Sequence, residues 1–303
     1  MPTTRNLESK DPQILLNRIS KEFPELSWDN FKFLNHGWDH EVITLDDRYA
    51  FRFPNSSEYL EIFKNEPDLL KLIASNCVVE VPIYHFVASD GSFGGCTFIK
   101  GCELRADLLS KVSKKQQESI VNQLADFLTT LHTIPKSKLK PYYLIPEKFQ
   151  DDMGKLKCRV EKFLQDTLSD KDYNLALSIL HEVEVVHSNN KPLVLVHDDL
   201  QGSNILWNNK NDSIGIIDFS DRFLGDPAHD FARFFEYGDD FVRQIYEVYA
   251  GPKDSNLIER GRLFYKRLSI ELMVDSFLTD KISFKKAKAF FDKVKSTKIG
   301  KER

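Results

Sequence analysis

The stretch VHDDLQGSNILW, residues 196–207, decides the fold that we expect for this chain. It sets His197, Asp199 and Asn204 between the apolar runs PLVLV and ILW. Burial of an unpaired charge is costly in free energy. Charged side chains at the ends of two strand-like runs therefore indicate that a partner or a ligand offsets this cost. We interpret the segment as a polar loop between two short strands, whose side chains serve ligand chemistry rather than packing.

The overlapping segment SNILWNNKNDSIGIIDFSD predicts a β-hairpin. Two apolar runs flank NNKND, a composition that favours tight turning. With the turn centred near Asn211, Asn204 and Asp218 lie seven residues to either side. They would then be cross-strand neighbours with Cβ atoms about 4.5 to 5.5 Å apart, close enough for one amide and one carboxylate to bind a divalent cation. The alternative is a hairpin whose polar ends only cap its strands.

Asp199 stands five residues before Asn204, on the loop that enters the first strand of this hairpin. A carboxylate there can accept or orient the proton of an attacking hydroxyl while a metal neutralises phosphates, the division of labour in phosphoryl transfer. Position matters more than base strength in such a reaction. For His197 we favour a structural role, as a hydrogen-bonding residue that holds the loop, over proton transfer.

The first hundred residues predict a small antiparallel sheet with one or two helices. FKFLNHG, HEVITLDDRYAFRFP and CTFIKG are rich in β-branched and aromatic residues and are broken by turn signals such as Asp46–Asp47. Helices are predicted over residues 11–22 and in EPDLLKLIAS, residues 66–75. Pro67 is compatible with the second helix only in its first turn or at a kink.

Arg52 and Glu66 form a second candidate constellation in this part of the chain. A cation on a strand that faces a phosphate pair, steadied by a carboxylate from the next helix, would complete a nucleotide site. The two residues are equally compatible with an ordinary salt bridge, and both interpretations stay open. The loop NHGWDH contains a single glycine, Gly37, and is therefore a weak phosphate-cradling signal.

The rest of the chain predicts several helices. Apolar residues within 113–134 have the spacing of one long helix with a buried face, and residues 284–294 have the pattern of a last amphipathic helix. The expected fold class is α+β and bilobal. A small β-rich N-lobe spans residues 1–101, with a hinge at 96–101, and a larger helical C-lobe spans residues 102–303.

Bulk properties narrow the class of protein. A net charge of -4 over 303 residues disfavours a general nucleic-acid binder, which would carry a basic excess. The four cysteines show no Cys-x-x-Cys pair and no zinc spacing, so a reducing cytoplasm fits best. No segment approaches the roughly 18 apolar residues of a membrane span, and the polar start does not resemble a signal peptide. We expect a cytoplasmic monomer without membrane or nucleic-acid partners.

Several common enzyme motifs are missing from the sequence. Without Gly-x4-Gly-Lys-Ser/Thr a P-loop enzyme is excluded at the level of motifs. The absence of Gly-x-Ser-x-Gly and His-Glu-x-x-His disfavours the common hydrolases and zinc proteases.

Residues 224–240, LGDPAHDFARFFEYGDD, gather acidic side chains around one basic residue, Arg233. Asp226–Pro227 predicts a turn, and residues 229–249 predict a helix with aromatic faces. The acids can steer a polycationic substrate, or they can form a solvated helix end in which one of them braces a loop. Both interpretations stay open. The acids are Asp226, Asp230, Glu236, Asp239 and Asp240.

HDDLQGSN, IIDFSD and GDPAHDFA follow one another in this order, after HGWDHEVITLDDRYAFRFP and CTFIKG. Together they resemble the His-x-Asp-x4-Asn, Ile-Asp-Phe and Gly-Asp-Pro-x-x-Asp-Phe motifs of the aminoglycoside phosphotransferase family, over roughly residues 34–249. The resemblance implies a protein-kinase-like fold. It is greatest to the subgroup that phosphorylates the 2''-hydroxyl of gentamicin- and kanamycin-like aminoglycosides, with macrolide phosphotransferases as near relatives.

The resemblance implies roles in the transfer step. Asp199 would be the catalytic aspartate, Asn204 and Asp218 would bind Mg²⁺, and Asp230 would brace the catalytic loop. Ser220 stands where the Asp-Phe-Gly motif of kinases has its glycine. The reaction would move the γ-phosphate of ATP or GTP to a small-molecule hydroxyl.

The resemblance also implies a nucleotide site. Arg52 would pair with the phosphates and with Glu66, and the backbone of a hinge from Thr97 to Ile99 would meet the purine. Kinases have lysine at the position of Arg52, so the phosphate contact here would be bidentate rather than point-like.

For aminoglycosides the family's acceptor cleft lies in the larger lobe and is acidic. The C-terminal segment LFYKRLSIELMVDSFLTDKISF lacks the Gly, Trp and acidic pattern associated with the 2'' subgroup. The alternatives are a macrolide or other small-molecule hydroxyl kinase and, from a different class, a non-catalytic nucleotide-binding regulator. The candidate acceptor-binding acids are Asp230, Glu236, Asp239, Asp240 and Glu271, with Asp275 near the last.

Overall fold

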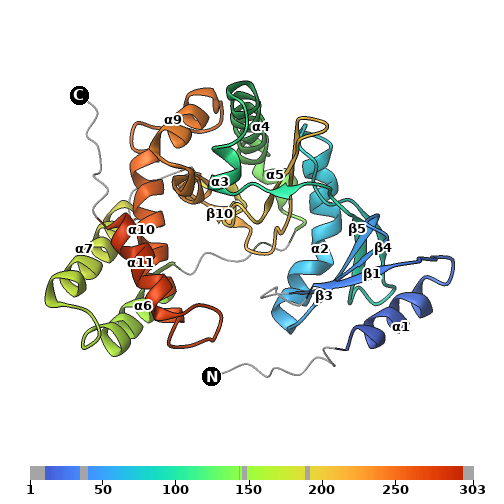
Figure 1. Ribbon diagram of the computed structural model, residues 1–303, viewed down its shortest axis with the longest axis horizontal. Helices are drawn as coiled ribbons and strands as arrows, with labels where there is room; N and C mark the ends of the chain where they lie inside the picture. Colours follow the sequence, from blue (N-terminus) through green and yellow to red (C-terminus); the bar gives the residue numbers. More distant parts are fainter. Residues whose placement is uncertain (1–10, 35–39, 143, 145–148, 188–191, 296–303) are drawn as a thin grey trace.

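The computed structural model describes residues 11–34, 40–142, 144, 149–187 and 192–295. It has an α+β architecture, with a small lobe built on an antiparallel sheet and a larger, mostly helical lobe (Figure 1). The predicted fold class is therefore confirmed. The loop around Gly37 lies outside the described residues.

The N-lobe sheet has five antiparallel strands in the order β1-β2-β3-β5-β4. The predicted turn between β2 and β3 is present, and Asp46 and Asp47 in it have φ values of 51° and 50°. Aspartate tolerates this left-handed conformation better than most residues. The strands are β1 Phe31–Leu34, β2 His40–Leu45, β3 Tyr49–Pro54, β4 Tyr84–Val87 and β5 Gly94–Thr97.

Alternating residues give the two faces of this sheet different tasks. Ile43 and Phe51 point to one face, where they form a core with Leu16 of α1, Pro12–Glu22. Val42 and Ala50 belong to the opposite face and line a pocket. The sheet is thus anchored from one side and leaves the other side for a ligand.

Helix α2, Ser57–Ala74, begins nine residues earlier than the sequence predicts. The side chain of Ser56 caps it by accepting a hydrogen bond from the Tyr59 N–H at 3.3 Å. Pro67 consequently lies inside the helix and not in its first turn, which corrects that part of the prediction. Burial of Ile62 and Phe63 extends the apolar face upstream of the proline, which the short predicted segment did not include.

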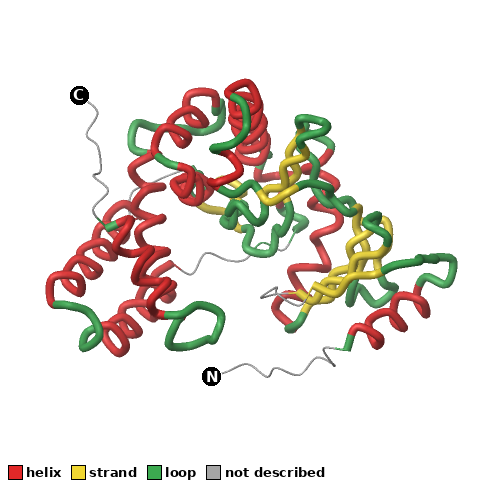
Figure 2. Tube along the Cα trace, in the orientation of Figure 1, coloured by secondary structure: helices red, strands yellow, loops and turns green. Residues whose placement is uncertain are grey.

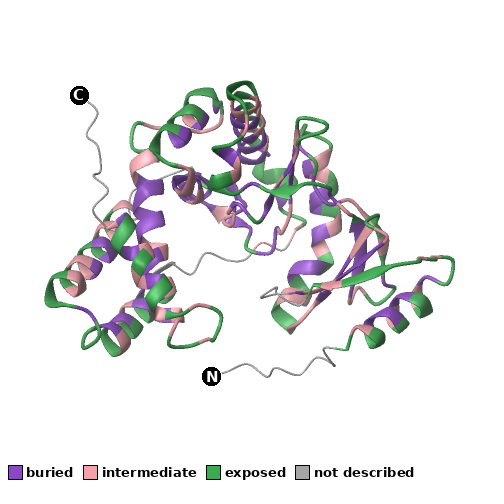
Figure 3. Cartoon of the chain, in the orientation of Figure 1, coloured by how far each residue is buried: buried purple, intermediate pink, exposed green. Residues whose placement is uncertain are grey.

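The C-lobe contains most of the helices, and Figure 3 shows buried residues gathered along α4 and α10. The predicted long helix is confirmed as α4, with a capping box formed by Ser113 and Gln116. The predicted last helix is confirmed as α11. The helices are α3 Ala106–Leu109, α4 Lys114–Thr133, α5 Lys136–Leu139, α6 Phe149–Leu164, α7 Asp170–His187, α8 Ala228–Ala232, α9 Asp239–Val248, α10 Leu257–Asp275 and α11 Phe284–Val294.

The helix predicted over residues 229–249 is interrupted. Helix α8 is followed by the 3-10 turn η1, Arg233–Tyr237, and only then by α9. Gly238 separates the last two with a φ of 103°, a conformation that ends a right-handed helix. Because of this break, the side chains of Arg233 and Glu236 do not point in the directions that one continuous helix would give them.

Two small sheets lie in the C-lobe beside the N-lobe, apart from the five-stranded sheet (Figure 2). The predicted hairpin is confirmed, but its centre falls between residues 210 and 211, because Asn208 pairs with Ser213. Asn204 therefore lies opposite Ile217 and not opposite Asp218, which corrects the predicted register. The strands are β6 Cys102–Glu103, β7 Val194–Val196, β8 Ile205–Asn208, β9 Ser213–Ile216 and β10 Phe223–Gly225.

Backbone contacts join the lobes at two places. Residues 98–101 lead from β5 to β6, which pairs with β8 of the C-lobe. Glu80, between α2 and β4, exchanges backbone hydrogen bonds with Ile214 (3.1 Å) and Ile216 (2.8 Å) of β9. Among the described residues, no helix is long and apolar enough to cross a membrane.

Candidate active site

Asp230 lies beneath the loop that follows β7 and is completely buried. It accepts hydrogen bonds from the backbone N–H groups of His197 (3.0 Å) and Asp198 (2.7 Å), and it contacts His132 Nε2 at 2.9 Å. Burial by itself would raise the pKa of Asp230, but the contact with His132 and the loop N–H groups lowers it below its usual value. The side chain has no exposed surface for an acceptor to contact, and its assignment to acceptor binding stays a prediction. Its position agrees with bracing the loop.

His197 is also buried, and both of its ring nitrogens are engaged by the backbone. Nδ1 accepts a hydrogen bond from the Asp199 N–H at 3.3 Å, and Nε2 donates to the Ile217 carbonyl at 3.1 Å. The first contact requires an unprotonated Nδ1, so the proton lies on Nε2. This arrangement supports the structural role that we favoured for His197.

Asp199 is held by three side chains. Its Oδ2 accepts from Asn204 Nδ2 at 2.7 Å and from Gln201 Nε2 at 2.9 Å, and its Oδ1 accepts from a guanidinium N–H of Arg233 at 2.8 Å. The side chain keeps 14% exposure. Asp198, just before it, has a φ of 66°, an uncommon conformation that turns the chain at this point. The structure thus presents Asp199 on a tightly determined loop.

Asn204 and Asp218 have the donor atoms that a divalent cation needs. Because Asn204 uses its Nδ2 for Asp199, its Oδ1 is left without a partner among the described residues. Asp218 uses Oδ1 to accept from Arg52 (2.8 Å) and Ser220 (2.9 Å), and its side chain is 40% exposed. Mg²⁺ is commonly bound by one or two such oxygens together with waters and phosphates. The residues present therefore fit a magnesium ion shared with a nucleotide.

The backbone brings these two residues together despite the corrected register. The Ile217 N–H donates to the Asn204 carbonyl at 3.0 Å, and Asp218 follows directly. Asp218 has a φ of 63°, a turn conformation two residues after the end of β9. Burial alone would raise the pKa of Asp218, but Arg52 next to it lowers the pKa, so the carboxylate stays ionised.

Arg52 and Glu66 form a buried ion pair with an N–O distance of 2.5 Å. The Tyr84 hydroxyl also donates to Glu66, at 2.8 Å. Burial by itself would lower the pKa of Arg52, but Glu66, Tyr84 and Asp218 together raise it well above its usual value. Arg52 contacts both Glu66 and Asp218, which joins the two constellations seen separately in the sequence.

Arg222 belongs to the same cluster and was missed by sequence analysis. It donates to Glu66 Oε2 at 3.1 Å, to the Phe219 carbonyl at 2.7 Å and to the Ile62 carbonyl at 2.9 Å. Burial lowers the pKa of this guanidinium. Arg222 thus fastens α2 of the N-lobe to the segment after β9. In the sequence Arg222 is visible only as the basic residue of the segment SDRF. Its distance along the chain from Glu66 gives no sign that the two side chains form a pair.

The predicted hinge borders a pocket of about 190 Å³ between the N-lobe sheet and β8. Thr97 and Ile99 both line it, together with Ala50 and Leu206. The Thr97 N–H is used by the Ile83 carbonyl at 2.9 Å, whereas the Ile99 N–H has no partner among the described residues. The Ile99 N–H is therefore a free hydrogen-bond donor at the edge of this largely apolar pocket. A flat apolar pocket with one such donor is suited to a purine base.

Glu236 is directed toward the loop between Asp199 and Asn204 and not toward open solvent. Its Oε1 accepts from the Gly202 N–H at 2.8 Å, and burial raises the pKa of this carboxyl group. A Cβ on Gly202 would come within 2.5 Å of the Leu104 carbonyl oxygen, so glycine permits the close approach. Glu236 supports the loop between Asp199 and Asn204.

The other candidate acceptor acids are not gathered into one free acidic surface. Each is paired with an arginine of the same chain, although all three keep some exposure. An internal cation cancels much of the field that a carboxylate would offer to a cationic ligand. The pairs are Asp239–Arg262 (2.9 Å), Asp240–Arg243 (3.2 Å) and Glu271–Arg267 (2.9 Å).

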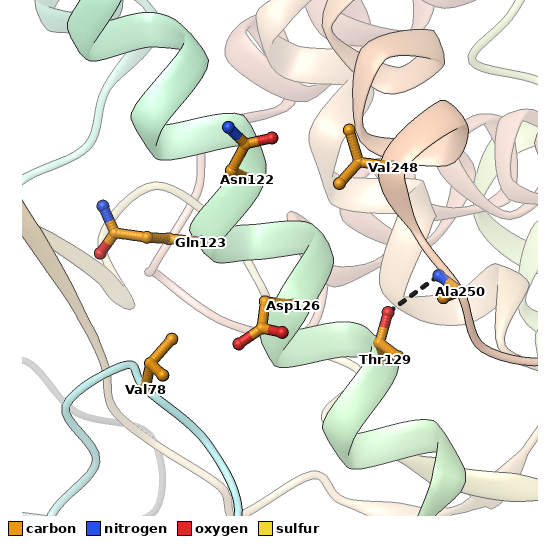
Figure 4. Close-up of a pocket in the computed structure, with 7 residues that line it drawn as sticks. All are labelled: Val78, Asn122, Gln123, Asp126, Thr129, Val248 and Ala250. Atoms are coloured by element: carbon orange, nitrogen blue, oxygen red, sulfur yellow. Dashed lines mark hydrogen bonds between the residues drawn. The ribbon is translucent and has the colours of Figure 1, made fainter.

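A separate hollow of about 430 Å³ lies along α4, where Figure 4 shows Asn122, Gln123 and Asp126 facing it. At one end the Ala250 N–H donates to the Thr129 hydroxyl at 3.0 Å. None of the predicted site residues lines this hollow. The candidate active site is therefore the region between the lobes.

This geometry can be compared with known proteins. The family model described as "Phosphotransferase enzyme family" matches residues 30–264, which include the loop from Asp199 to Asn204 and the hairpin. The chain belongs to this family. The matched range includes Arg52, Asp199 and Asp218, and the structure brings Arg52 into contact with Asp218.

Solved structures of similar fold include phosphotransferases in complex with ligands. "Structure of the GDP and kanamycin complex of APH(2")-IIia" matches with a TM-score of 0.83 and 22% identity, over 93% of this chain and 98% of that one. "Structure of the gentamicin-APH(2")-IIa complex" matches with a TM-score of 0.70 and 20% identity, over 97% and 98%. "Macrolide 2'-phosphotransferase type I" matches with a TM-score of 0.65 and 17% identity, over 97% and 100%. At these identities, the likeness establishes the shared fold.

Proposed function

We propose that this phosphotransferase moves the γ-phosphate of a magnesium-bound ATP or GTP to a hydroxyl group of a small molecule. The observation that carries the proposal is the convergence of Asp199, Asn204 and Asp218 on one loop and hairpin, with Arg52 in contact with Asp218. Phosphoryl transfer needs positioning and charge neutralisation more than strong bases. This cluster supplies both.

Each residue has a task in this scheme. The Ile99 N–H meets the purine, and Arg52, oriented by Glu66, contacts the phosphates. A magnesium ion held by Asn204 Oδ1 and Asp218 would neutralise charge on the transferring phosphoryl group. Asp199 orients the acceptor hydroxyl and takes up its proton.

The proposed acceptor is an aminoglycoside, at its 2''-hydroxyl. Support comes from the shared fold of the kanamycin and gentamicin complexes. Such modification would protect a cell from the antibiotic, and it would take place in the cytoplasm, by a monomer. A macrolide or another weakly charged alcohol is the second candidate, because the pairing of Asp239, Asp240 and Glu271 with arginines leaves little free negative charge for a polycation.

A transfer assay with mass-spectrometric detection tests the proposal. The full-length chain is incubated with magnesium and ATP or GTP, separately, against kanamycin, gentamicin, erythromycin and a control without acceptor. Phosphorylated kanamycin or gentamicin supports the aminoglycoside proposal, and phosphorylated erythromycin supports the second candidate. Nucleotide that binds but is never consumed would point to a regulator and overturn the proposal.

The metal assignment has its own test. Asn204→Ala and Asp218→Ala should each raise the magnesium concentration needed for half-maximal turnover by about tenfold or more, because each removes an oxygen ligand. Asn208→Ala, at the other end of β8, is the matched control. Magnesium titrations that coincide with the wild type would remove these residues from the metal site.

A further inference from the structure

Arg233, in the C-lobe, contacts the carboxylate of Asp199, the proposed catalytic residue. It is the first residue of η1, three residues after Asp230, so the two side chains extend from neighbouring turns of one segment. Asp230 holds the backbone of the catalytic loop at His197 and Asp198, whereas Arg233 holds the side chain of Asp199 at 2.8 Å. One short segment therefore determines both the path of the loop and the orientation of its carboxylate.

The hydrogen bonds to Asp199 distinguish its two oxygens. Oδ2 accepts from both Asn204 and Gln201, and Oδ1 accepts only from Arg233 among the described residues. A carboxylate oxygen accepts about two hydrogen bonds. Oδ2 is therefore saturated, and Oδ1 has a lone pair free for a further donor.

We propose that Arg233 is a positioning residue that directs Oδ1 of Asp199 at the acceptor hydroxyl. The inference rests on the proposed function, in which Asp199 receives the hydroxyl proton. In the transfer step the acceptor O–H bond breaks as a new O–P bond forms to the γ-phosphorus. The bond between that phosphorus and the β–γ bridging oxygen breaks, and the proton passes to Asp199 Oδ1 and then to solvent.

Packing makes a purely structural role for Arg233 a poor explanation. The side chain is 24% exposed, and Asp199 is its only hydrogen-bond partner among the described residues. Partly exposed ion pairs contribute little to stability. Removal of Arg233 should therefore affect the orientation of Asp199 more than the fold.

The test uses the full-length variants Arg233→Ala and Arg233→Lys, with Arg105→Ala as control. Arg105 is an exposed arginine whose partner, Asp107, is not a site residue. Misplacement of a reacting group by about 1 Å can cost on the order of 100-fold in rate. Arg233→Ala should lower kcat by about that factor with the nucleotide KM within about twofold, and Arg233→Lys should recover part of the loss. Added guanidinium at millimolar concentration should partly rescue Arg233→Ala, because it can occupy the vacated position.

Two readouts keep the outcomes distinguishable. Transfer is measured to whichever of kanamycin, gentamicin and erythromycin the wild type accepts, and slow nucleotide hydrolysis is measured with water as the acceptor. A wild type that shows neither reaction overturns the proposed function and this inference with it. An active wild type with Arg233→Ala at the same kcat overturns the inference alone, as does a loss that neither lysine nor guanidinium restores.

Discussion

Two ion clusters at the candidate active site use the same residue types in different ways. The interlobe cluster, Glu66 with Arg52 and Arg222, is buried, with side-chain exposures of 0%, 10% and 1%. The loop cluster, Asp199 with Arg233, keeps side-chain exposures of 14% and 24%. Buried ions need all their partners, whereas partly exposed ions can exchange partners with water or substrate.

This difference in exposure suggests that the interlobe cluster maintains the arrangement of the lobes and that the loop cluster serves the reaction. The interlobe cluster joins α2 to the segment after β9 and so determines how Arg52, the proposed phosphate contact, faces Asp218. We expect the loop cluster to reorganise more readily when an acceptor arrives, because both of its side chains keep contact with solvent. We expect the first to control mainly stability and the second mainly turnover.

The largest expected effect is that of Glu66→Gln on the interlobe cluster. It leaves the two arginines without their common counter-ion, and breaking a buried ion pair costs about 3 to 5 kcal/mol of unfolding free energy. Urea unfolding followed by circular dichroism measures the loss. Glu271→Gln, which breaks only the partly exposed pair with Arg267, should cost less than about 1 kcal/mol. Equal losses for the two variants would contradict the comparison.

The opposite pattern is expected for Asp199→Asn in the loop cluster. Removal of a positioned proton acceptor should lower transfer by about 10²- to 10⁴-fold. The unfolding free energy should change by less than about 1 kcal/mol, since the pair with Arg233 is partly exposed. The transfer assay and the urea titration are run on the same preparation. Full activity in this variant would remove Asp199 from the mechanism.

Acidification should act on the interlobe cluster through His40. This imidazole is buried with Nδ1 3.3 Å from Arg52, and burial together with that charge lowers its pKa well below the usual value. Below about pH 6.5 the unfolded chain binds a proton at this site and the folded chain does not, so stability falls by up to about 1.4 kcal/mol per pH unit. The lowered pKa of Asp218 adds a loss only below about pH 4.

Unfolding at pH 7.5, 6.5 and 5.5 measures this dependence. His40→Asn should flatten it, although part of the slope should remain because the pKa of His187 is also lowered by burial. A wild-type slope that the substitution does not change would show that His40 is not responsible.

The smallest effect is expected at Asp240, which belongs to neither cluster. Its side chain is 88% exposed and pairs with Arg243 at 3.2 Å. Asp240→Asn should change the unfolding free energy by less than about 0.5 kcal/mol and raise the KM for kanamycin by about twofold, through loss of one weakly acting charge. An unchanged KM would remove Asp240 from acceptor binding.

Local patterns predicted much of this fold correctly. The long apolar stripe of α4, the Asp46–Asp47 turn and the hairpin around NNKND are all present. These features depend on residues within a few positions of each other, where periodicity and turn chemistry act directly. The predicted start of α2 was wrong. A proline ordinarily lies in the first turn of a helix, but the apolar face of α2 continues upstream of Pro67.

The order of the motifs also placed Arg52, Glu66, Asp199, Asn204 and Asp218 in one candidate site, and the structure brings Arg52 into contact with both Glu66 and Asp218. The roles of these residues remain proposals. The exact hairpin register needed the cross-strand hydrogen bonds, because a shift of half a residue in the turn centre changes which residues face each other.

The sequence by itself determined the two-lobed α+β plan, the family and the residue types at the catalytic loop. Only the tertiary structure decided how those charges are neutralised. Arg222 reaches Ile62 across 160 positions, and Arg233 reaches Asp199 across 34. An ion pair has no sequence period, because a charge acts through space on whatever the fold brings near it. The interlobe cluster and the loop cluster therefore could be identified only from the folded structure of both lobes.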